Sequence, residues 1–542
     1  MVFHFPPVFA TFPPMSPTRR EALAQLAALT AFAALPRSAW GRTISDPLEG
    51  TIADYQVGFR RGTWSAVEVT TAALERCRTR GKELRAIDAL ADTALEEARA
   101  ADARRRSGQL RGPLDGVPVF AKSIYDVNGL PTTASNDEWA RLFPEAVRRD
   151  AVEVARLRAA GAIILGKTAA DDFAYRGSGT SSHTGQVRNP HDPTGLRSPG
   201  GSSAGSAVAV LTGIAFMGLG TDDGGSNRIP AQFSGVVGVK PSFGLVPRTG
   251  VIPTWPYLDT HGPLARSVAD AAVALAALAG PDSSDPLAGG SETRPYATLR
   301  DDALKGVRIG LVEGNIPRAK MTAEAVATWD RAMGDLKAAG AIVEPFDSPV
   351  VATNYRDAFA AAATQRGDVA VNDNSPAPTA NALYRYFAGR TDDPRAAIRR
   401  GYSAFRAFYD VLPERYEDCE PLLEQPMEKN PSGQSFARSR ATVVRILVDA
   451  MRAARVEAMV WPTMPFNALR LGEPWPDIRT TLSYNNWLGL PEVSVPAGIG
   501  ADGMPALNLS VVGFPGDDAR VLALAHAYER QSRRFVQPSF PP

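Results

Sequence analysis

Two glycine-rich segments contain the serines best suited to nucleophilic chemistry. Residues 198–206 read SPGGSSAGS, and residues 220–230 read GTDDGGSNRIP. Glycine lets backbone N–H groups approach a ligand closely and point toward it together, which favours binding of a developing oxyanion. Ser202 and Ser226 each follow a glycine directly. The pattern predicts a serine nucleophile with its oxyanion donors beside it.

A serine hydroxyl is a weak nucleophile until a base removes its proton. The candidate base is Lys122, which follows the apolar run VPVFA at 117–121. Burial disfavours the charged form of a lysine and lowers its pKa, so a desolvated Lys122 can accept a proton near neutral pH. Two plainer interpretations stay open, because most Gly-Ser loops are ordinary turns and most lysines at strand ends are solvated.

The elements that must position these residues are helices and strands that alternate with short turns, a pattern that predicts a mainly parallel sheet covered by helices. Ser65 and Glu68 match a capping box at the start of a helix. A helix that begins at 150–153 is expected to end at Gly161. Strands are expected at 162–165, 458–461, 493–495 and 509–512.

The segment 353–445 is helical in pattern, polar and rich in aromatic residues. A lid or pocket wall and a plain helical cover both fit this composition. The two cysteines, Cys77 and Cys419, are too few for a disulfide framework or a cysteine zinc site and are expected to pack in the interior. We find no pattern of metal ligands and expect neither a metal nor a cofactor.

The composition is that of an ordinary globular protein. The chain has 542 residues, of which 44% are apolar and 22% charged, and its formal net charge is +1. Global disorder is excluded. Because the chain has no net field to attract nucleic acid or an anionic membrane, we expect neither as a partner. The oligomeric state stays open.

The N-terminal residues resemble a twin-arginine export signal. The run SPTRREAL at 16–23 leads into an apolar stretch at 22–35, followed by the small residues Ala39 and Gly41. The apolar stretch is too short for a hydrocarbon core, which needs roughly 20 residues, so we expect no stable membrane insertion. We therefore expect an N-terminal extension and signal peptide at 1–41, starting from Met1 or Met15, and a periplasmic or secreted chain at 42–542. An amphipathic surface helix is the alternative.

Taken together, the chemistry-bearing segments resemble the amidase signature family. Residues 112–122 are similar to the family's lysine strand, 200–206 to its Gly-Gly-Ser-Ser loop and 221–230 to its nucleophile loop. Further matches extend the resemblance from about residue 50 to the C-terminus, at 189–190, 238–241, 259–266, 462–463, 489–491 and 496. The resemblance implies a single α/β domain, 42–542, with a mixed central β-sheet between layers of α-helices.

The resemblance also implies a mechanism. An amidase of this family hydrolyses a carboxylic amide to an acid and ammonia or an amine through a Ser-Ser-Lys triad and an acyl-enzyme. Lys122 would act as the base, Ser202 would relay the proton from a cis peptide with Gly201, and Ser226 would attack the carbonyl. The developing oxyanion would be bound by backbone N–H groups from Asp223 to Ser226, which places Asp223, Gly224 and Gly225 in the oxyanion hole.

The nucleophile loop contains three charged residues, Asp222, Asp223 and Arg228, whose expected roles differ. Asp222 and Arg228 are expected to pair across the base of the loop and hold its shape, with surface charge as the alternative. Asp223 stands where the family has threonine or an apolar residue. A carboxylate beside the oxyanion hole would repel the developing charge, which predicts either weak activity or a cationic substrate.

Other functions remain open at this point. Residues 201–205 also match the G-x-S-x-G elbow of an α/β-hydrolase-type esterase, with Ser203 as nucleophile and His261 or His526 as the base. A catalytically inactive binding protein with the amidase fold is another alternative, supported by Asp223. Within the family, the layout is similar to stand-alone secreted amidases such as peptide amidases, and the export pattern argues against the branch that makes amidated transfer RNA. The substrate is expected to be a small-molecule or peptide amide.

Overall fold

A large central β-sheet forms the core of the computed structural model, which describes residues 45–289, 296–369, 375–476 and 481–538. In these ranges 11 strands make up this sheet: β1 (Ile87–Leu90), β2 (Pro118–Lys122), β3 (Ile163–Thr168), β6 (Met217–Asp222), β7 (Val237–Lys240), β8 (Thr260–Ala265), β9 (Arg308–Leu311), β10 (Ile342–Pro345), β11 (Ala458–Pro462), β12 (Glu492–Ile499) and β13 (Pro505–Val512). A separate hairpin pairs β4 (Thr180–Ser181) with β5 (Gly185–Gln186). The expected signal peptide at 1–41 lies outside the described residues.

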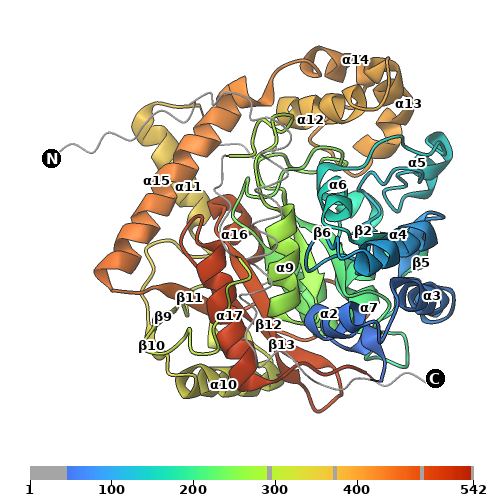
Figure 1. Ribbon diagram of the computed structural model, residues 1–542. Coiled ribbons are helices and arrows are strands. Elements are labelled where there is room, and N and C mark those ends of the chain that lie inside the picture. Colours follow the sequence, from blue (N-terminus) through green and yellow to red (C-terminus); the bar gives the residue numbers. More distant parts are fainter. Residues whose placement is uncertain (1–44, 290–295, 370–374, 477–480, 539–542) are drawn as a thin grey trace.

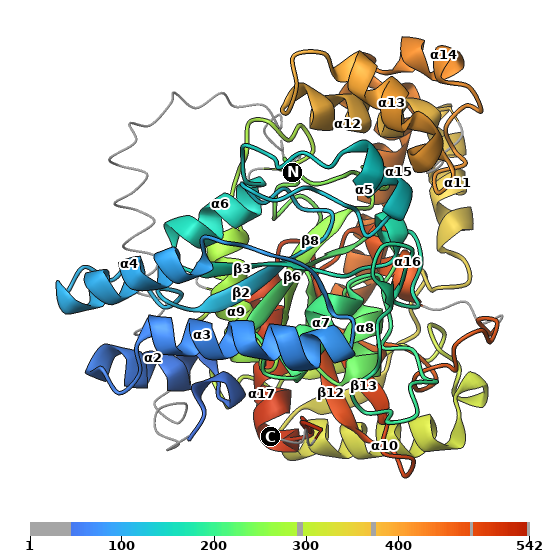
Figure 2. The same cartoon turned by 90° about the vertical axis from the view of Figure 1, so that its right-hand side faces the viewer.

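Helices cover both faces of the sheet. The α-helices are α2 (Ile52–Arg61), α3 (Ala66–Arg76), α4 (Ala94–Arg106), α5 (Asp137–Leu142), α6 (Val152–Ala159), α7 (Ala204–Leu211), α8 (Arg228–Ser234), α9 (Val268–Leu278), α10 (Ala323–Ala338), α11 (Tyr355–Arg366), α12 (Pro376–Ala388), α13 (Pro394–Arg406), α14 (Tyr416–Cys419), α15 (Pro431–Ala453), α16 (Thr481–Leu488) and α17 (Asp518–Ser532). Helices α7 and α8 pack on one face, and α9 and α17 lie on the opposite face (Figures 1 and 2). No helix in the described ranges is long and apolar enough to cross a membrane.

The strand order is β1-β3-β2-β6-β8-β7-β12-β13-β11-β9-β10. The pairs β2–β3, β2–β6, β9–β10 and β9–β11 are parallel, and the other pairs are antiparallel. The mixed sheet implied by the family resemblance is confirmed, whereas the mainly parallel sheet expected from alternation is wrong. A strand that is buried on both faces is a continuous apolar run whether its neighbours are parallel or antiparallel. Its sequence therefore does not reveal which pairing it adopts.

Local predictions that rest on short-range chemistry are confirmed. The Ser65 and Glu68 capping box opens α3. Helix α6 is followed by Gly161, which has φ +90°, and then by β3. The strands expected near the C-terminus are β11, β12 and β13. Cys77 and Cys419 are both buried and unpaired.

The segment 353–445 forms α11 to α14 and much of α15, and α12 to α14 lie together beside α5 (Figure 2). Residues of α12 and the turn after it line a cavity of about 910 Å³, whose other wall includes Asp259 and His261. This placement is consistent with a pocket wall. That role stays a prediction.

Candidate active site

The lysine strand and the nucleophile loop meet at one edge of the sheet. Strands β2 and β6 are parallel neighbours, so their carboxyl ends lie side by side. Lys122 is the last residue of β2 and Asp222 the last of β6, and the loop 223–227 follows directly. The Ser203 N–H donates to the Ser226 carbonyl at 3.1 Å and joins this loop to the segment that contains Ser202. Open α/β sheets place their functional residues at this kind of edge.

Lys122 has no exposed surface, and its amine contacts two hydroxyl groups. Its Nζ donates to Ser202 Oγ at 2.7 Å and to Thr221 Oγ1 at 2.8 Å. Burial lowers the pKa of Lys122 to about 8, and the carboxylate of Asp223 opposes part of that shift. The solvated-lysine interpretation is therefore wrong. The sequence analysis missed Thr221, because no local signal marks it as a partner of Lys122.

The Gly201–Ser202 peptide bond is cis, as the family resemblance implies. Gly201 has no room for a side chain, because a Cβ there would overlap Asp171 Oδ2. Asp171 was also missed from the sequence. Its Oδ1 accepts N–H bonds from Ser178 at 3.3 Å and from Gly179 and Thr180 at 3.1 Å. Asp171 therefore holds the neighbouring loop against the Ser202 segment.

The Ser226 hydroxyl is bound to Asp223 rather than to Ser202. Its Oγ donates to Asp223 Oδ1 at 3.4 Å, and no hydrogen bond between Ser202 and Ser226 occurs in the part of the chain that the structure describes. The structure thus brings the Lys122 and Ser202 side chains into contact and leaves Ser226 pointing toward Asp223. A relay through all three requires the Ser226 hydroxyl to donate to Ser202 instead of Asp223.

The N–H groups expected in the oxyanion hole differ in their present partners. The Gly225 N–H donates to Asp222 Oδ1 at 2.7 Å, so this group is engaged in the structure, and its role in the oxyanion hole stays a prediction. The N–H groups of Gly224 and Ser226 donate to no atom of the described chain. A Cβ on Gly224 would find Ser483 Oγ as its nearest neighbour, at 3.7 Å, so the space beside it is open. Gly224 and Ser226 are therefore the donors best placed for an oxyanion.

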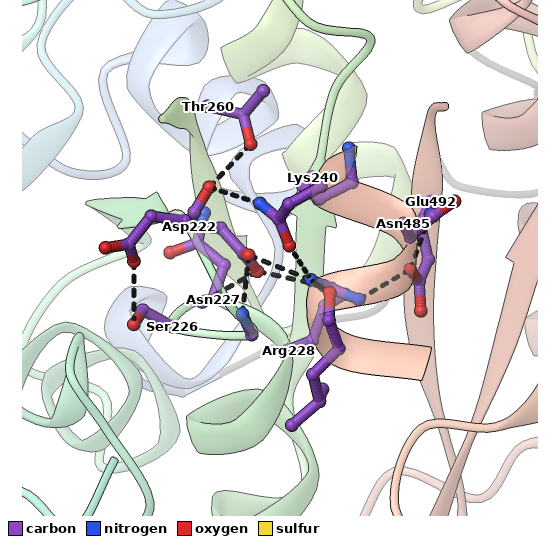
Figure 3. Close-up of polar contacts among 12 residues, drawn as sticks. Asp222, Ser226, Asn227, Arg228, Lys240, Thr260, Asn485 and Glu492 are labelled. Atoms are coloured by element: carbon purple, nitrogen blue, oxygen red, sulfur yellow. Dashed lines mark hydrogen bonds and ion pairs between the residues drawn. The ribbon is translucent and has the colours of Figure 1, made fainter. Parts of the chain in front are cut away.

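Asp222 and Arg228 pair as expected, and the surface-charge alternative is wrong because neither side chain is exposed (Figure 3). Arg228 makes two bonds of 2.9 Å to the Asp222 carboxylate and one of 2.8 Å to Glu492. Burial alone would raise the pKa of Asp222, but the guanidinium beside it lowers the pKa to about 2. The sequence analysis missed Glu492 and also Asn485, which donates to Glu492 at 2.7 Å.

Asp223 has the opposite environment. It is 5% exposed, and its Oδ2 has no hydrogen-bond partner among the described residues. Burial, followed by the neighbouring carboxylate of Asp259, raises the pKa of Asp223 to about 7. The site therefore keeps a buried carboxyl oxygen without a donor next to Ser226.

Ser203 does not form a hydrolase elbow. It accepts the Thr221 N–H at 3.3 Å and donates to Asn227 Oδ1 at 3.2 Å. The candidate bases are engaged elsewhere: His261 contacts Glu153 at 2.6 Å, and His526 contacts Asp301 at 3.0 Å. Because no histidine contacts Ser203 within the described ranges, the esterase alternative is wrong. The same ranges contain no group of three or more His, Cys, Asp or Glu residues that could hold a metal ion.

Comparisons with known proteins agree on one family. The family model described as Amidase matches residues 68–522. The chain is 34% identical over 501 residues to the A subunit of the Glutamyl-tRNA(Gln) amidotransferase from Symbiobacterium thermophilum, across 88% of this chain and 95% of that one. The native peptide amidase from Stenotrophomonas maltophilia is 32% identical with a TM-score of 0.74, across 91% of this chain and 99% of that one. A bacterial aryl acylamidase, 24% identical with a TM-score of 0.68 across 89% of this chain and 96% of its own, shares the fold.

Proposed function

The chain belongs to the amidase family, and we propose from this premise that it hydrolyses a carboxylic amide with Ser226 as nucleophile, Ser202 as relay and Lys122 as base. The observation that carries the proposal is the 2.7 Å contact between Lys122 Nζ and Ser202 Oγ inside a fully buried site. A neutral lysine amine in that position accepts a proton without an imidazole.

The reaction follows from the geometry. Ser226 Oγ attacks the amide carbonyl while its proton passes to Ser202, whose own proton passes to Lys122. The N–H groups of Gly224 and Ser226 bind the oxyanion, and each such donor is worth about 3 to 4 kcal/mol in comparable sites. The departing nitrogen takes a proton back through Ser202 as the C–N bond breaks. Water then attacks the ester on Ser226 by the same relay and releases the acid.

The proposal predicts distinct results for two buried lysines on neighbouring strands. Lys122→Met should lower kcat/KM for amide hydrolysis about 10²- to 10⁴-fold, because the base is lost. Lys167→Met is the matched control, since Lys167 is equally buried and its amine donates to the Pro131 carbonyl, at 2.9 Å, rather than to a serine. Lys167→Met should keep a rate close to that of the wild type once folded protein is quantified. Ammonia release across a panel of amides measures both.

A nucleophile test completes this experiment. Ser226→Ala should lower kcat by about 10⁴-fold or more, whereas Ser203→Ala should not, because Ser203 only joins two loops. Full activity in Lys122→Met or Ser226→Ala would overturn the triad. A wild-type protein that hydrolyses no amide in the panel would favour the inactive binding protein.

We also propose that the chain is an exported, stand-alone amidase. The twin-arginine pattern at 16–41 supports export, and a solved structure that the chain resembles is named as a peptide amidase rather than as an amidotransferase subunit. The relative named as part of an amidotransferase supports a second candidate, an enzyme that works with partner chains. Ammonia release by the purified protein without other chains would favour the first candidate, and activity that depends on added partner chains would favour the second.

Export has its own test. Residues 1–41 fused to a reporter should direct it to the periplasm, and replacing Arg19 and Arg20 together by lysine should retain it in the cytoplasm. Arg37→Lys is the control and should leave export unchanged. Periplasmic reporter in the double lysine variant would contradict the twin-arginine assignment.

A further inference from the structure

The side chain of Asp223 has no role in the amide chemistry described above. It is 5% exposed, its Oδ1 lies 3.4 Å from Ser226 Oγ, and its Oδ2 has no partner within the described residues. A buried carboxylate oxygen without a donor is unfavourable, because the hydrogen bonds it makes in water are not replaced. The oxygen therefore lacks a hydrogen-bond donor that a molecule bound at Ser226 would supply.

An aromatic cluster contains Tyr409, on which the Asp223 carboxylate acts electrostatically. Burial, followed by the Asp223 charge, raises the pKa of Tyr409. The Tyr409 ring centre lies 5.7 Å from that of Tyr175 and 6.0 Å from that of Trp255, and the latter two lie 5.7 Å apart. The Tyr409 hydroxyl donates to the Phe173 carbonyl, so it does not satisfy the carboxylate. Aromatic rings and a carboxylate in one neighbourhood favour a cation.

The charges around the site also favour binding of a cation. Asp259 adds a second carboxylate near Asp223, and its own oxygens accept the N–H groups of Thr254 at 3.0 Å and Trp255 at 3.2 Å. The nearby cations are engaged. Arg228 binds Asp222 and Glu492, Arg248 binds Asp285 at 2.6 Å, and burial lowers the pKa of Lys122. Carboxylates therefore exceed the available positive charge at the nucleophile.

We infer that Asp223 binds the protonated α-amino group of the substrate, and that the substrates of this site are amides of free amino acids or of peptides with the scissile amide next to a free α-amine. This deepens the proposed function and rests on it. Standard bond lengths place an α-nitrogen about 2.5 Å from its carbonyl carbon. Attack brings that carbon to about 3 to 3.5 Å from Ser226 Oγ, which itself lies 3.4 Å from Asp223 Oδ1. An ammonium two bonds from the scissile carbon can thus reach Asp223 while Ser226 reaches the carbonyl.

The same contact resolves two difficulties of the site. An ammonium at Asp223 neutralises the charge that would otherwise repel the oxyanion held by Gly224 and Ser226. It also competes with the Ser226 hydroxyl for Asp223 Oδ1 and so favours rotation of that hydroxyl toward Ser202. Binding of the cationic substrate therefore assembles the relay.

The test compares leucinamide with N-acetyl-leucinamide, which has the same side chain and scissile amide but no ammonium. At pH 7 the wild type should hydrolyse leucinamide with a kcat/KM about 10- to 100-fold higher, as expected for one charge-assisted hydrogen bond in a buried site. In Asp223→Asn this ratio should fall toward one, mainly through KM for leucinamide. Asp302→Asn is the control, because Asp302 is an exposed carboxylate paired with Arg300, and it should keep the wild-type ratio.

A binding measurement separates this inference from the proposed function. Calorimetry on Ser226→Ala should show tighter binding of leucinamide than of N-acetyl-leucinamide, and Asp223→Asn in that background should remove the difference. Equal or better hydrolysis of the acetylated amide by the wild type would overturn the inference and leave the amidase function intact, as would an unchanged ratio in Asp223→Asn. Preferential binding of leucinamide without turnover of either amide would support the ammonium site and overturn the proposed function. Neither turnover nor preferential binding would overturn both.

Discussion

Asp222 and Asp223 are consecutive, both buried and opposite in every other respect. Asp222 accepts hydrogen bonds from Arg228 and from the Gly225 N–H, and its pKa falls to about 2. Asp223 keeps an oxygen without a partner in the described chain, and its pKa rises to about 7. Burial is common to both, so the supply of donors and cations decides the direction in which each pKa shifts. The Asp222 side of the nucleophile loop is held by an ion pair, whereas the Asp223 side keeps a carboxyl oxygen without a donor in the described chain.

The largest effect on stability is expected from the ion pair on the Asp222 side of the loop. Arg228→Met leaves the carboxylates of Asp222 and Glu492 buried without their cation, which should lower the free energy of unfolding by about 3 to 5 kcal/mol. Activity should be lost with the shape of the nucleophile loop. Denaturant unfolding followed by circular dichroism measures the change.

A surface pair provides the control for this variant. Arg300 forms a 2.8 Å ion pair with Asp302, but both side chains are largely exposed. Arg300→Met should therefore leave the unfolding midpoint unchanged. If Arg228→Met were as stable as the wild type, the ion pair between Arg228 and Asp222 would not be what stabilises the loop.

A smaller effect on stability is expected from the Asp223 side of the loop, and this effect depends on pH. The raised pKa of Asp223 means that the folded protein binds a proton more tightly than the unfolded chain between about pH 4 and about pH 7, so stability falls as pH rises through this window. Asp222, with its lowered pKa, contributes stability that is lost as pH falls from about 4 to about 2. Asp223→Asn should remove only the first dependence.

The measurement is the unfolding midpoint of wild type and Asp223→Asn at pH 5 and at pH 8. The variant should gain stability relative to the wild type between these values, because it no longer ionises inside the site. A difference between the two proteins that does not change with pH would show that Asp223 has an ordinary pKa.

The smallest effect concerns the activity of Lys122. The amine must be neutral to act as a base, so kcat/KM for a neutral amide should rise with pH through about 8. The Asp223 charge stabilises the ammonium form of Lys122, so Asp223→Asn should move this rise to lower pH, and the other carboxylates nearby should limit the change. N-acetyl-leucinamide is the suitable substrate because it has no amine to titrate. A shift to higher pH would contradict the contact between the two charges.

Most of the candidate reactive side chains could be identified from the sequence, because the residues next to them form recognisable patterns. Preceding glycines mark Ser202 and Ser226, and an apolar strand marks Lys122. The residues that orient them could not be found in this way. Thr221, Asp171 and Glu492 have ordinary sequence surroundings, and each acts through a contact with a residue far along the chain.

The oxyanion hole shows the same limit within a single loop. The glycine-rich sequence indicates backbone donors, but all N–H groups look alike in a sequence. Only the folded loop shows that Gly225 donates to Asp222 while Gly224 and Ser226 keep their N–H groups free of partners in the described chain.

By itself the sequence determined the family, the kind of fold, the helix caps and the candidate reactive groups, because these depend on residue type and short spacing. The tertiary structure decided the directions of the strands, the partner of each buried charge and the present orientation of Ser226 toward Asp223. Hydrogen bonds and pKa values depend on which atoms lie within a few ångströms in space, and the chain brings those atoms together from positions that are far apart in sequence.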